Sequence, residues 1–444
     1  MTLGPVANAR VATPSPGVTF RGTSYQLPKR FDIGNSDRTM SPEDTFQNVQ
    51  PAFSRVGLTR VGNITGLDRL GIPVTVAIRP NSYSLTQSSG KGITLAAALA
   101  SAAMESLELY CAENITQPVL QASYDEIRQD HISLPVDDMY LSKYSLFHPK
   151  RTEEWLLGWD IMNDVEVAVP YHSVSLDFRA LNDAACPASF TMDSNGLASG
   201  NHFLEALLSA LLEVIERDGV SIHSELERHG QLKRRVDLDA FGSDTVLDIA
   251  RRLEEVGVQV AVLDCTTDID IPVFEAFVYD ERSNSIALAH GYGAHLNPAT
   301  AATRAITEAV QARTLIVSGA RDDLFKDIYT AHRFRHGSNV GLLETNHIWA
   351  PMDHVNQATS TFEGDVDVLL KALCSAGLNR VVVLDLSPDD IEISVLRVLV
   401  PGLEGYYYYG YNPRVRARRY VSGLARQVVD PRENSTHMPA GGIV

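Results

Sequence analysis

Three segments of the sequence combine the apolar content of buried helices with acidic residues in their interiors. They lie within residues 89–114, 202–224 and 297–319. Consecutive residues of an α-helix are offset by about 100°, so residues four or seven positions apart lie on nearly the same line. In the first segment Ser101, Glu105 and Glu108 have this spacing and form a polar stripe on a helix made mainly of Ala, Leu and Met. A fold that buries this helix must also provide partners for the stripe.

The two other segments repeat the pattern. The second, with the residue before it, carries Asn201, Glu205, Glu213, Glu216 and Arg217. The third carries Arg304 and Glu308, which are four residues apart. On a single helix such residues usually form a solvated face, where a Glu–Arg pair contributes roughly a few tenths of a kcal/mol. Three helices of the same kind favour a shared polar site instead.

This polar set predicts a particular kind of ligand. Carboxylates, arginines and an asparagine on apolar helices are costly to bury unless their charge is compensated. Mg²⁺ would compensate it, because this ion takes carboxylate oxygens as ligands and completes its octahedron with phosphate oxygens and water. Arginine side chains can bind phosphate through two parallel hydrogen bonds. The sequence therefore predicts a metal–polyphosphate site built from helices.

The sequence SSGKG resembles a phosphate loop only in part. A Walker motif requires Gly six residues before the Lys and Ser or Thr after it, whereas this chain has Leu85 and Gly92 there. The motif is therefore not a P-loop. We expect residues 81–92 to form a loop in which Gly90 and Gly92 allow close backbone approach to a ligand and Lys91 contacts that ligand.

Composition limits the partners of the chain. Its net charge of −17 argues against general affinity for nucleic acid or for an anionic membrane. The four cysteines, at positions 111, 186, 265 and 374, are far apart and form no CxxC pair, so neither a zinc site nor a disulfide framework is indicated. No signal peptide or continuous apolar membrane span is apparent. We expect a protein of the reducing cytoplasm.

The order of predicted elements favours one large α+β domain. Residues 1–35, rich in Pro, Gly, Ser and Thr, predict a poorly ordered lead-in. SPEDTFQNV at 41–49 has the pattern of a capped helix start, so the folded domain is expected to span 36–425, followed by a tail at 426–444. Strands are expected at 72–80, 166–178 (as a pair), 256–266, 271–280 and 285–296. Strands in groups favour mixed or antiparallel sheets covered by helices.

Three further features carry weaker signals. His290 and His295 lie outside any HExxH motif, which favours core or loop histidines over metal ligands. Cys111 is expected to be a small buried residue. The segment GYYYYGYNPRVRARRY at 405–420 could stack on RNA, but the acidic composition of the chain favours a strand with a solvated basic end.

Several of these pieces together resemble the YcaO superfamily. They are SGKG followed by SAAMESLELY, then SNGLASGNHFLEALLSALLEVIERD, then RAITEAVQAR before SGARDDL. The similarity as a whole spans about residues 36–425. The resemblance implies helices and antiparallel sheets that enclose a pocket for ATP and Mg²⁺. It implies nucleotide contacts for Ser101, Asn201, Arg217, Arg304 and Glu308, beside the ligand contact expected of Lys91 from its loop. It implies metal ligation or orientation by Glu105, Glu108, Glu205, Glu213 and Glu216. The family often has Arg after the second acid of the first motif, where this chain has Leu109.

The resemblance also implies a reaction, in which ATP activates a backbone amide of a ribosomally made peptide or of a protein. A Cys, Ser or Thr side chain of the substrate would then give an azoline, an amine a macrocyclic amidine, and sulfide a thioamide. Azoline-forming members typically end in a proline-rich tail, whereas this chain ends HMPAGGIV.

The segments SDRTMSPEDT, GLTRVGNITGLDRLGIPVTVAIRPNS and SGARDDL resemble the branch that acts with TfuA-type partners. Thioamidation with such a sulfur-supplying partner is therefore the expected function. A cyclodehydratase, a macroamidine-forming enzyme and a non-catalytic ATP-binding accessory protein are the alternatives. A homodimer is expected from the relatives.

Overall fold

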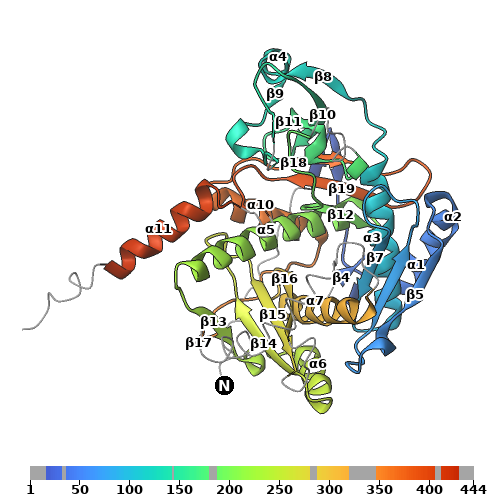
Figure 1. The fold of residues 1–444 in the computed structure, drawn as a ribbon, viewed down its shortest axis with the longest axis vertical. Coiled ribbons are helices and arrows are strands. Elements are labelled where there is room, and N and C mark those ends of the chain that lie inside the picture. Colours follow the sequence, from blue (N-terminus) through green and yellow to red (C-terminus); the bar gives the residue numbers. More distant parts are fainter. Residues whose placement is uncertain are drawn as a thin grey trace, which may run out of the picture.

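A computed structural model of the chain describes residues 17–32, 37–142, 145–179, 188–280, 288–319, 347–405 and 412–429 (Figure 1). In these residues helices cover sheets that are mostly antiparallel, which confirms the α+β prediction. Three sheets, of three, five and seven strands, meet around the long helices α3 (Leu95–Glu113), α5 (Phe203–Arg228) and α7 (Pro298–Ser318). These are the three helices that the sequence predicted.

The five-stranded sheet lies between α5 and α7. In spatial order its strands are β16 (Leu288–Ala294), β15 (Val273–Tyr279), β14 (Gln259–Asp264), β13 (Lys233–Val236) and β17 (His347–Ala350). Only β13 and β17 pair in parallel. Phe274 faces a core shared with α7 and α6 (Asp244–Glu255), whereas Tyr292 faces a core shared with α5. The strands predicted within 256–296 are confirmed.

The seven-stranded sheet packs on the other side of α5. Its strands in order are β12 (Leu197–Gly200), β19 (Ser394–Leu399), β18 (Val382–Asp385), β10 (Thr152–Asp160), β11 (Val165–Pro170) and β9 (Ile132–Ser133), with β8 (Leu120–Ser123) also paired to β10. The helices α10 (Phe362–Ser375) and α4 (Tyr124–Asp130) flank this half. The pair of strands predicted at 166–178 is wrong, because β11 ends at Pro170 and a short 3-10 helix follows.

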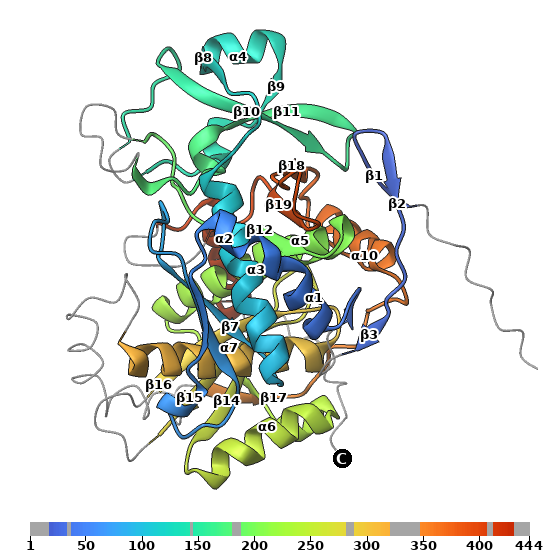
Figure 2. The same cartoon turned by 90° about the vertical axis from the view of Figure 1, so that its right-hand side faces the viewer.

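The three-stranded sheet corrects the interpretation of the SSGKG segment. Its strands are β5 (Arg60–Asn63), β6 (Val74–Ile78) and β7 (Gln87–Lys91), and it packs with α1 (Pro42–Val49) and α2 (Phe53–Val56) near α3. The strand predicted at 72–80 is confirmed, but the loop predicted at 81–92 is wrong for β7. A Cβ on Gly90 would lie 2.0 Å from the carbonyl oxygen of Ala98. This glycine therefore allows β7 to lie directly on α3, an arrangement visible in Figure 2.

Side-chain caps fix the starts of the predicted helices. The Ser41 hydroxyl accepts a hydrogen bond from the Asp44 main-chain N–H at the start of α1. At α3 the Thr94 hydroxyl accepts from Ala97, and at α7 the Asn297 side chain accepts from Ala299 with Pro298 in the first turn. Such caps satisfy N–H groups that have no partner inside the helix.

Both predicted ends of the folded domain are corrected. The strands β1 (Val18–Phe20) and β2 (Thr23–Tyr25) pair, and Val18 and Phe20 belong to the core around α5 and α10. A short pair, β3 (Phe31–Asp32) and β4 (Asp37–Arg38), follows. The chain is therefore folded well before residue 36, because two apolar side chains in a polar segment are sufficient to anchor a hairpin. At the other end, α11 (Val415–Val429) is a helix where the solvated basic end of a strand was predicted, and it extends past residue 425. The aromatic part of that prediction, residues 406–411, lies outside the described residues.

Among the helices that the structure describes, α3 alone has the length and hydropathy of a membrane span. More than half of its most apolar window is buried inside the protein, where it packs on β6, β7 and β12. This burial is that of a core helix.

Candidate functional site

Edge strands of all three large sheets converge on the helices that carry the predicted acids. β7 and β12 each end a sheet, so one side of each strand has main-chain N–H groups without a strand partner. The N–H of Ser89 on β7 donates to Glu105 Oε2 at 3.1 Å. Glu108, one turn further along α3, hydrogen-bonds the side chain and the main chain of Ser199 on β12. The acidic stripe of α3 therefore faces the free edges of two sheets.

The free edge of β16 is bonded in the same way by acids of the other two helices. The N–H of Tyr292 donates to Glu308 Oε1 of α7 at 3.3 Å, and that of Ala294 donates to Glu216 Oε2 of α5 at 3.1 Å. Each of these carboxylates uses one oxygen on a strand edge. Side-chain periodicity could not predict these contacts, because they depend on which strands end the sheets.

A lysine links the two strand edges across the site. Lys91 on β7 lies 2.5 Å from Glu308 Oε2, measured from Nζ. Burial opposes ionisation of Glu308, but Lys91 and Arg217 lower its pKa below the ordinary value. Beside this pair, the Gln311 amide donates to the Ser89 hydroxyl at 3.0 Å. Lys91 thus lies in the predicted site, although it reaches the site from a strand.

The remaining acids repel one another. Burial raises the pKa of Glu108 well above its ordinary value, and Glu213 and Glu105 raise it further. Burial also raises the pKa of Glu213 to about 7, an effect that Arg217 opposes and Glu216 reinforces. Acids from α3 and α5 are therefore close enough to affect one another's ionisation, as the sequence predicted. A divalent cation between them would favour their charged forms.

Glu205 at the start of α5 is the centre of a second group. Its side chain accepts hydrogen bonds from the Thr39 hydroxyl at 2.8 Å and from the Asn201 main-chain N–H at 3.2 Å. Arg38 Nε lies 3.6 Å from its other oxygen, and the Asn201 amide donates to the Thr45 hydroxyl at 3.0 Å. Arg38, Thr39 and Thr45 are residues that the helix patterns missed. The segment SDRTMSPEDT was noted only for its family resemblance.

Arg304 and Ser101 complete the predicted set. Arg304 acts on the pKa of both Glu216 and Arg38, so it lies between the two groups. Its Nε is buried and has no hydrogen-bond partner among the residues that the structure describes. Ser101 is half-buried on α3, one turn before Glu105. All predicted site residues therefore lie on β7, α3, α5 or α7, apart from Asn201, which lies two residues before the start of α5.

These residues fit a metal–phosphate ligand better than a metal alone. Among the residues that the structure describes, no group of three or more His, Cys, Asp or Glu side chains is placed so that it could hold a metal ion by itself. Mg²⁺ bound with a nucleotide needs only one or two carboxylates, because phosphate oxygens and water fill its other positions. The mutually repelling acids fit such an ion, and the unpaired buried donor of Arg304 fits a phosphate oxygen.

The weaker sequence features have structural explanations. His295 is buried, and its Nδ1 accepts from the Asn297 main-chain N–H at 2.9 Å, as expected of a core or turn histidine. His290 lies on β16, next to Glu275. Cys111 is buried as predicted, and burial raises the pKa of its thiol to about 12. Cys265 and Cys374 are free thiols, and Cys186 lies outside the described residues.

Comparisons with known proteins identify the family of the chain. Residues 89–404 match the family model described as "YcaO cyclodehydratase, ATP-ad Mg2+-binding". The chain is 35% identical over 397 residues to a protein in the tfuA 3' region of Rhizobium leguminosarum bv. trifolii, covering 85% of this chain and 91% of that protein. The cofactor prediction of ATP and Mg²⁺ agrees with the family description.

Two solved structures share the fold. YcaO from Methanopyrus kandleri, bound with AMPPCP and Mg²⁺, matches with a TM-score of 0.64 and 23% identity over 85% of this chain and 95% of that one. A heterocyclase in complex with substrate and cofactor matches with a TM-score of 0.74 and 24% identity over 91% of this chain. The match spans 56% of the heterocyclase, so this chain corresponds to little more than half of that protein.

Proposed function

The chain belongs to the YcaO family, and from this premise we propose that it uses Mg²⁺ and ATP to activate a backbone amide of a peptide or protein for conversion into a thioamide. The observation that carries the proposal is the set of acids on α3, α5 and α7 that meet at three strand edges. A surface set of charges would not raise one another's pKa values in this way.

The residues present have separate roles in this proposal. Glu105, Glu108, Glu205, Glu213 and Glu216 would hold or orient Mg²⁺. Lys91, Ser101, Asn201, Arg217, Arg304 and Glu308 would bind the nucleotide. When bound, Mg–ATP supplies the phosphoryl group that makes the amide oxygen a leaving group. Arg304 and Arg217 place positive charge where phosphate charge must be stabilised, and the strand edges hold the acids in position.

Two of these residues are already arranged for phosphate. The Arg304 Nε has no hydrogen-bond partner in the described parts of the chain, so a phosphate oxygen would satisfy a buried donor. Lys91 is neutralised by Glu308 in the structure, so it can exchange this partner for a phosphate oxygen. Both side chains could therefore form favourable contacts with a nucleotide phosphate without a large rearrangement of the protein.

The sulfur nucleophile is supported by relatedness and by motifs. The relative from the tfuA 3' region is 35% identical to this chain. A TfuA-type protein is therefore the proposed sulfur-delivery partner, and the cytoplasm is the proposed compartment. The family description as a cyclodehydratase favours azoline formation as the second candidate, because there the nucleophile is a side chain of the substrate. A homodimer remains an expectation from the family.

Mass spectrometry of the candidate substrate tests the reaction. The peptide or protein encoded beside this gene would be co-expressed with this chain and its neighbours, with and without Glu216→Gln. We expect replacement of one oxygen atom by sulfur in the substrate, dependent on ATP, on Mg²⁺ and on Glu216. Loss of one water molecule would instead assign cyclodehydration, and an unmodified substrate with intact ATP binding would assign an accessory role.

A matched control separates the site from general packing. Glu363 on α10 is buried and accepts from the Leu27 main-chain N–H at 2.9 Å, much as Glu216 accepts from Ala294. Glu363→Gln keeps the acceptor and lies outside the site, so product formation should survive. Glu205→Gln and Glu216→Gln should abolish product while the protein remains folded. Equal activity of all three variants would refute the metal site.

A further inference from the structure

The helix α5 makes buried polar contacts on the face opposite the site, at the turn that carries Glu216 and Arg217. Asp218 follows Glu216 by two residues, so its side chain points about 200° around the helix from that of Glu216, to the opposite face. The Asp218 carboxylate is completely buried. Burial raises its pKa to about 6, against the opposing effect of Arg416. A buried carboxylate on the rear of a site helix calls for an explanation.

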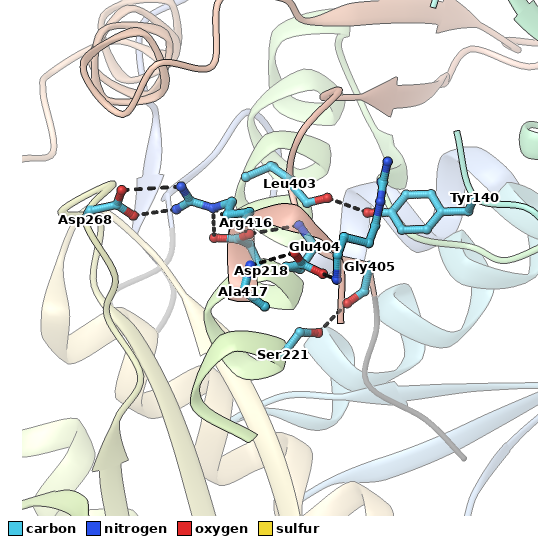
Figure 3. A network of polar contacts seen from close by, with 10 residues as sticks. Tyr140, Asp218, Ser221, Asp268, Leu403, Glu404, Gly405, Arg416 and Ala417 are labelled. Carbon is cyan, nitrogen blue, oxygen red and sulfur yellow. Dashed lines mark hydrogen bonds and ion pairs between the residues drawn. The ribbon is translucent and has the colours of Figure 1, made fainter. Parts of the chain in front are cut away.

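Its partners come from the C-terminal part of the chain. Arg416 Nε donates to both Asp218 oxygens, at 2.9 and 3.0 Å, and the Glu404 main-chain N–H donates to Oδ1 at 2.9 Å (Figure 3). The other end of the Arg416 guanidinium binds Asp268, in the connection between β14 and β15. One arginine therefore joins α5, α11 and the loop between β14 and β15 of the five-stranded sheet.

The start of α11 is fixed at the same place. Glu404 is completely buried, and its carboxylate accepts from the main-chain N–H of Arg414 at 3.0 Å. It also accepts from the main-chain N–H of Ala417 at 2.8 Å (Figure 3). A carboxylate at the first turn of a helix stabilises it through the unpaired N–H groups and the helix dipole. The Ser221 hydroxyl of α5 also donates to the Gly405 carbonyl. The first turn of α11 is therefore attached to α5. Tyr420 and Val421 of the next turn also pack on Ile222 and Leu226 of α5, and the far end of α11 projects from the body (Figure 1).

The same turn of α5 is held on its other sides. Glu216 accepts from Ala294 on β16 at 3.1 Å. A Cβ on Gly219 would lie 2.7 Å from the Cys265 carbonyl oxygen, so the helix lies directly against the end of β14 there. With Asp218 fixed as well, α5 can neither rotate nor shift at this turn without breaking one of these contacts.

A buried ion pair of this kind is weak evidence for a stabilising role, because desolvation offsets its attraction. A need for one defined orientation of α5 explains the ion pair better. We propose that Asp218 is a positioning residue which, through Arg416 and the start of α11, fixes the rotation of α5 that presents its site residues to Mg–nucleotide. This inference rests on the proposed nucleotide site and adds the C-terminal helix to it.

Binding of AMPPCP with Mg²⁺, measured by calorimetry on the full chain without peptide, tests the inference. Asp218→Asn should weaken binding at least tenfold, because an amide cannot accept both hydrogen bonds from Arg416. Asp268→Asn is the matched control, since it removes an acid from the same arginine without touching α5. It should leave affinity within about twofold of the wild type. Hydrogen exchange of residues 415–429 should be faster in Asp218→Asn.

The double variant Asp218→Asn/Arg416→Gln distinguishes a loss of positioning from a general loss of folding. It removes both buried charges, so it should regain thermal stability over the single variant but keep the weak affinity. Wild-type affinity in the double variant, or an equal loss in Asp268→Asn, would overturn the positioning role. Equal binding by wild type and Asp218→Asn would overturn this inference alone, whereas no binding by the wild type would overturn the proposed function with it.

Discussion

Replacing Gly90 by alanine separates a packing role from a ligand-binding role for the SSGKG segment. The new Cβ would lie 2.0 Å from the Ala98 carbonyl oxygen and 2.4 Å from the Ala102 nitrogen. Non-bonded contacts of a Cβ atom are essentially never shorter than 3.0 Å, so β7 and α3 must separate by about 1 Å to accommodate the alanine. The obstacles are main-chain atoms, which cannot rotate away.

The expected cost follows from two effects. Overpacking of a close contact costs about 1–3 kcal/mol, and main-chain obstacles place this site at the upper end. The Thr75 hydroxyl on β6 also donates to the Ala98 carbonyl at 2.7 Å, and losing this buried bond adds about 1 kcal/mol. We therefore expect Gly90→Ala to lower the free energy of unfolding by about 3–4 kcal/mol.

Urea unfolding followed by circular dichroism measures this change. Gly66→Ala is the matched control, because a Cβ there would meet nothing within 4 Å. It should change the unfolding free energy by no more than about 0.5 kcal/mol. If Gly90→Ala were as stable as Gly66→Ala but bound AMPPCP and Mg²⁺ more weakly, the glycine would serve close approach of a ligand and our packing argument would be refuted.

Three further predictions concern charges. The pKa of Glu213 is raised from 4.5 to about 7, so the folded protein retains a proton that the unfolded chain loses in this range. Without ligand, the free energy of unfolding of the wild type should therefore fall by up to about 3 kcal/mol relative to Glu213→Gln as pH rises from 4.5 to 7. Thermal unfolding at several pH values measures this change. Lys91→Met should weaken AMPPCP binding with Mg²⁺ about tenfold by calorimetry, because it removes the ammonium group that would exchange Glu308 for a phosphate oxygen. Unchanged affinity would place Lys91 outside the nucleotide site. Arg313→Gln should lower stability by about 3 kcal/mol in denaturant unfolding, because buried Asp68 and Asp280 both lie within 4 Å of its guanidinium, and Arg313→Lys should restore part of the loss.

The helices and most strands could be predicted because local signals agree with the tertiary structure. The capped start at Asn297 and Pro298 and the alternating residues of β15 specify the same elements in isolation and in the fold. Glu105 and Glu216 are distant in sequence, yet both could be assigned to one site. Acids on apolar helices are tolerated inside a protein only where something compensates them.

The elements that were missed depend on long-range contacts. β7 reads QSSGK and lacks β-branched residues, so it is a strand only because β6 pairs with it and α3 covers it. The basic segment that starts α11 was expected to be solvated, but Arg416 finds acids on α5 and on the loop after β14. The role of Thr39 depends on its hydrogen bond to Glu205, 166 residues later. No local pattern contains such information.

The convergence of three strand edges has a consequence for how the protein avoids self-association. A free strand edge is a template for pairing with another chain, and proteins usually protect it with charge or cover it. In this fold the edges of β7, β12 and β16 face inward, and the carboxylates that occupy their N–H groups are the ones proposed to serve Mg–nucleotide. Removing such an acid by Glu→Ala would therefore leave a strand-edge N–H group without its acceptor, which favours pairing of a locally opened edge with another chain, and would also disable the site. Loss of solubility in such a variant should not be read as evidence against a role in nucleotide binding, and Gln, which can still accept the strand N–H, is the substitution that separates the two effects.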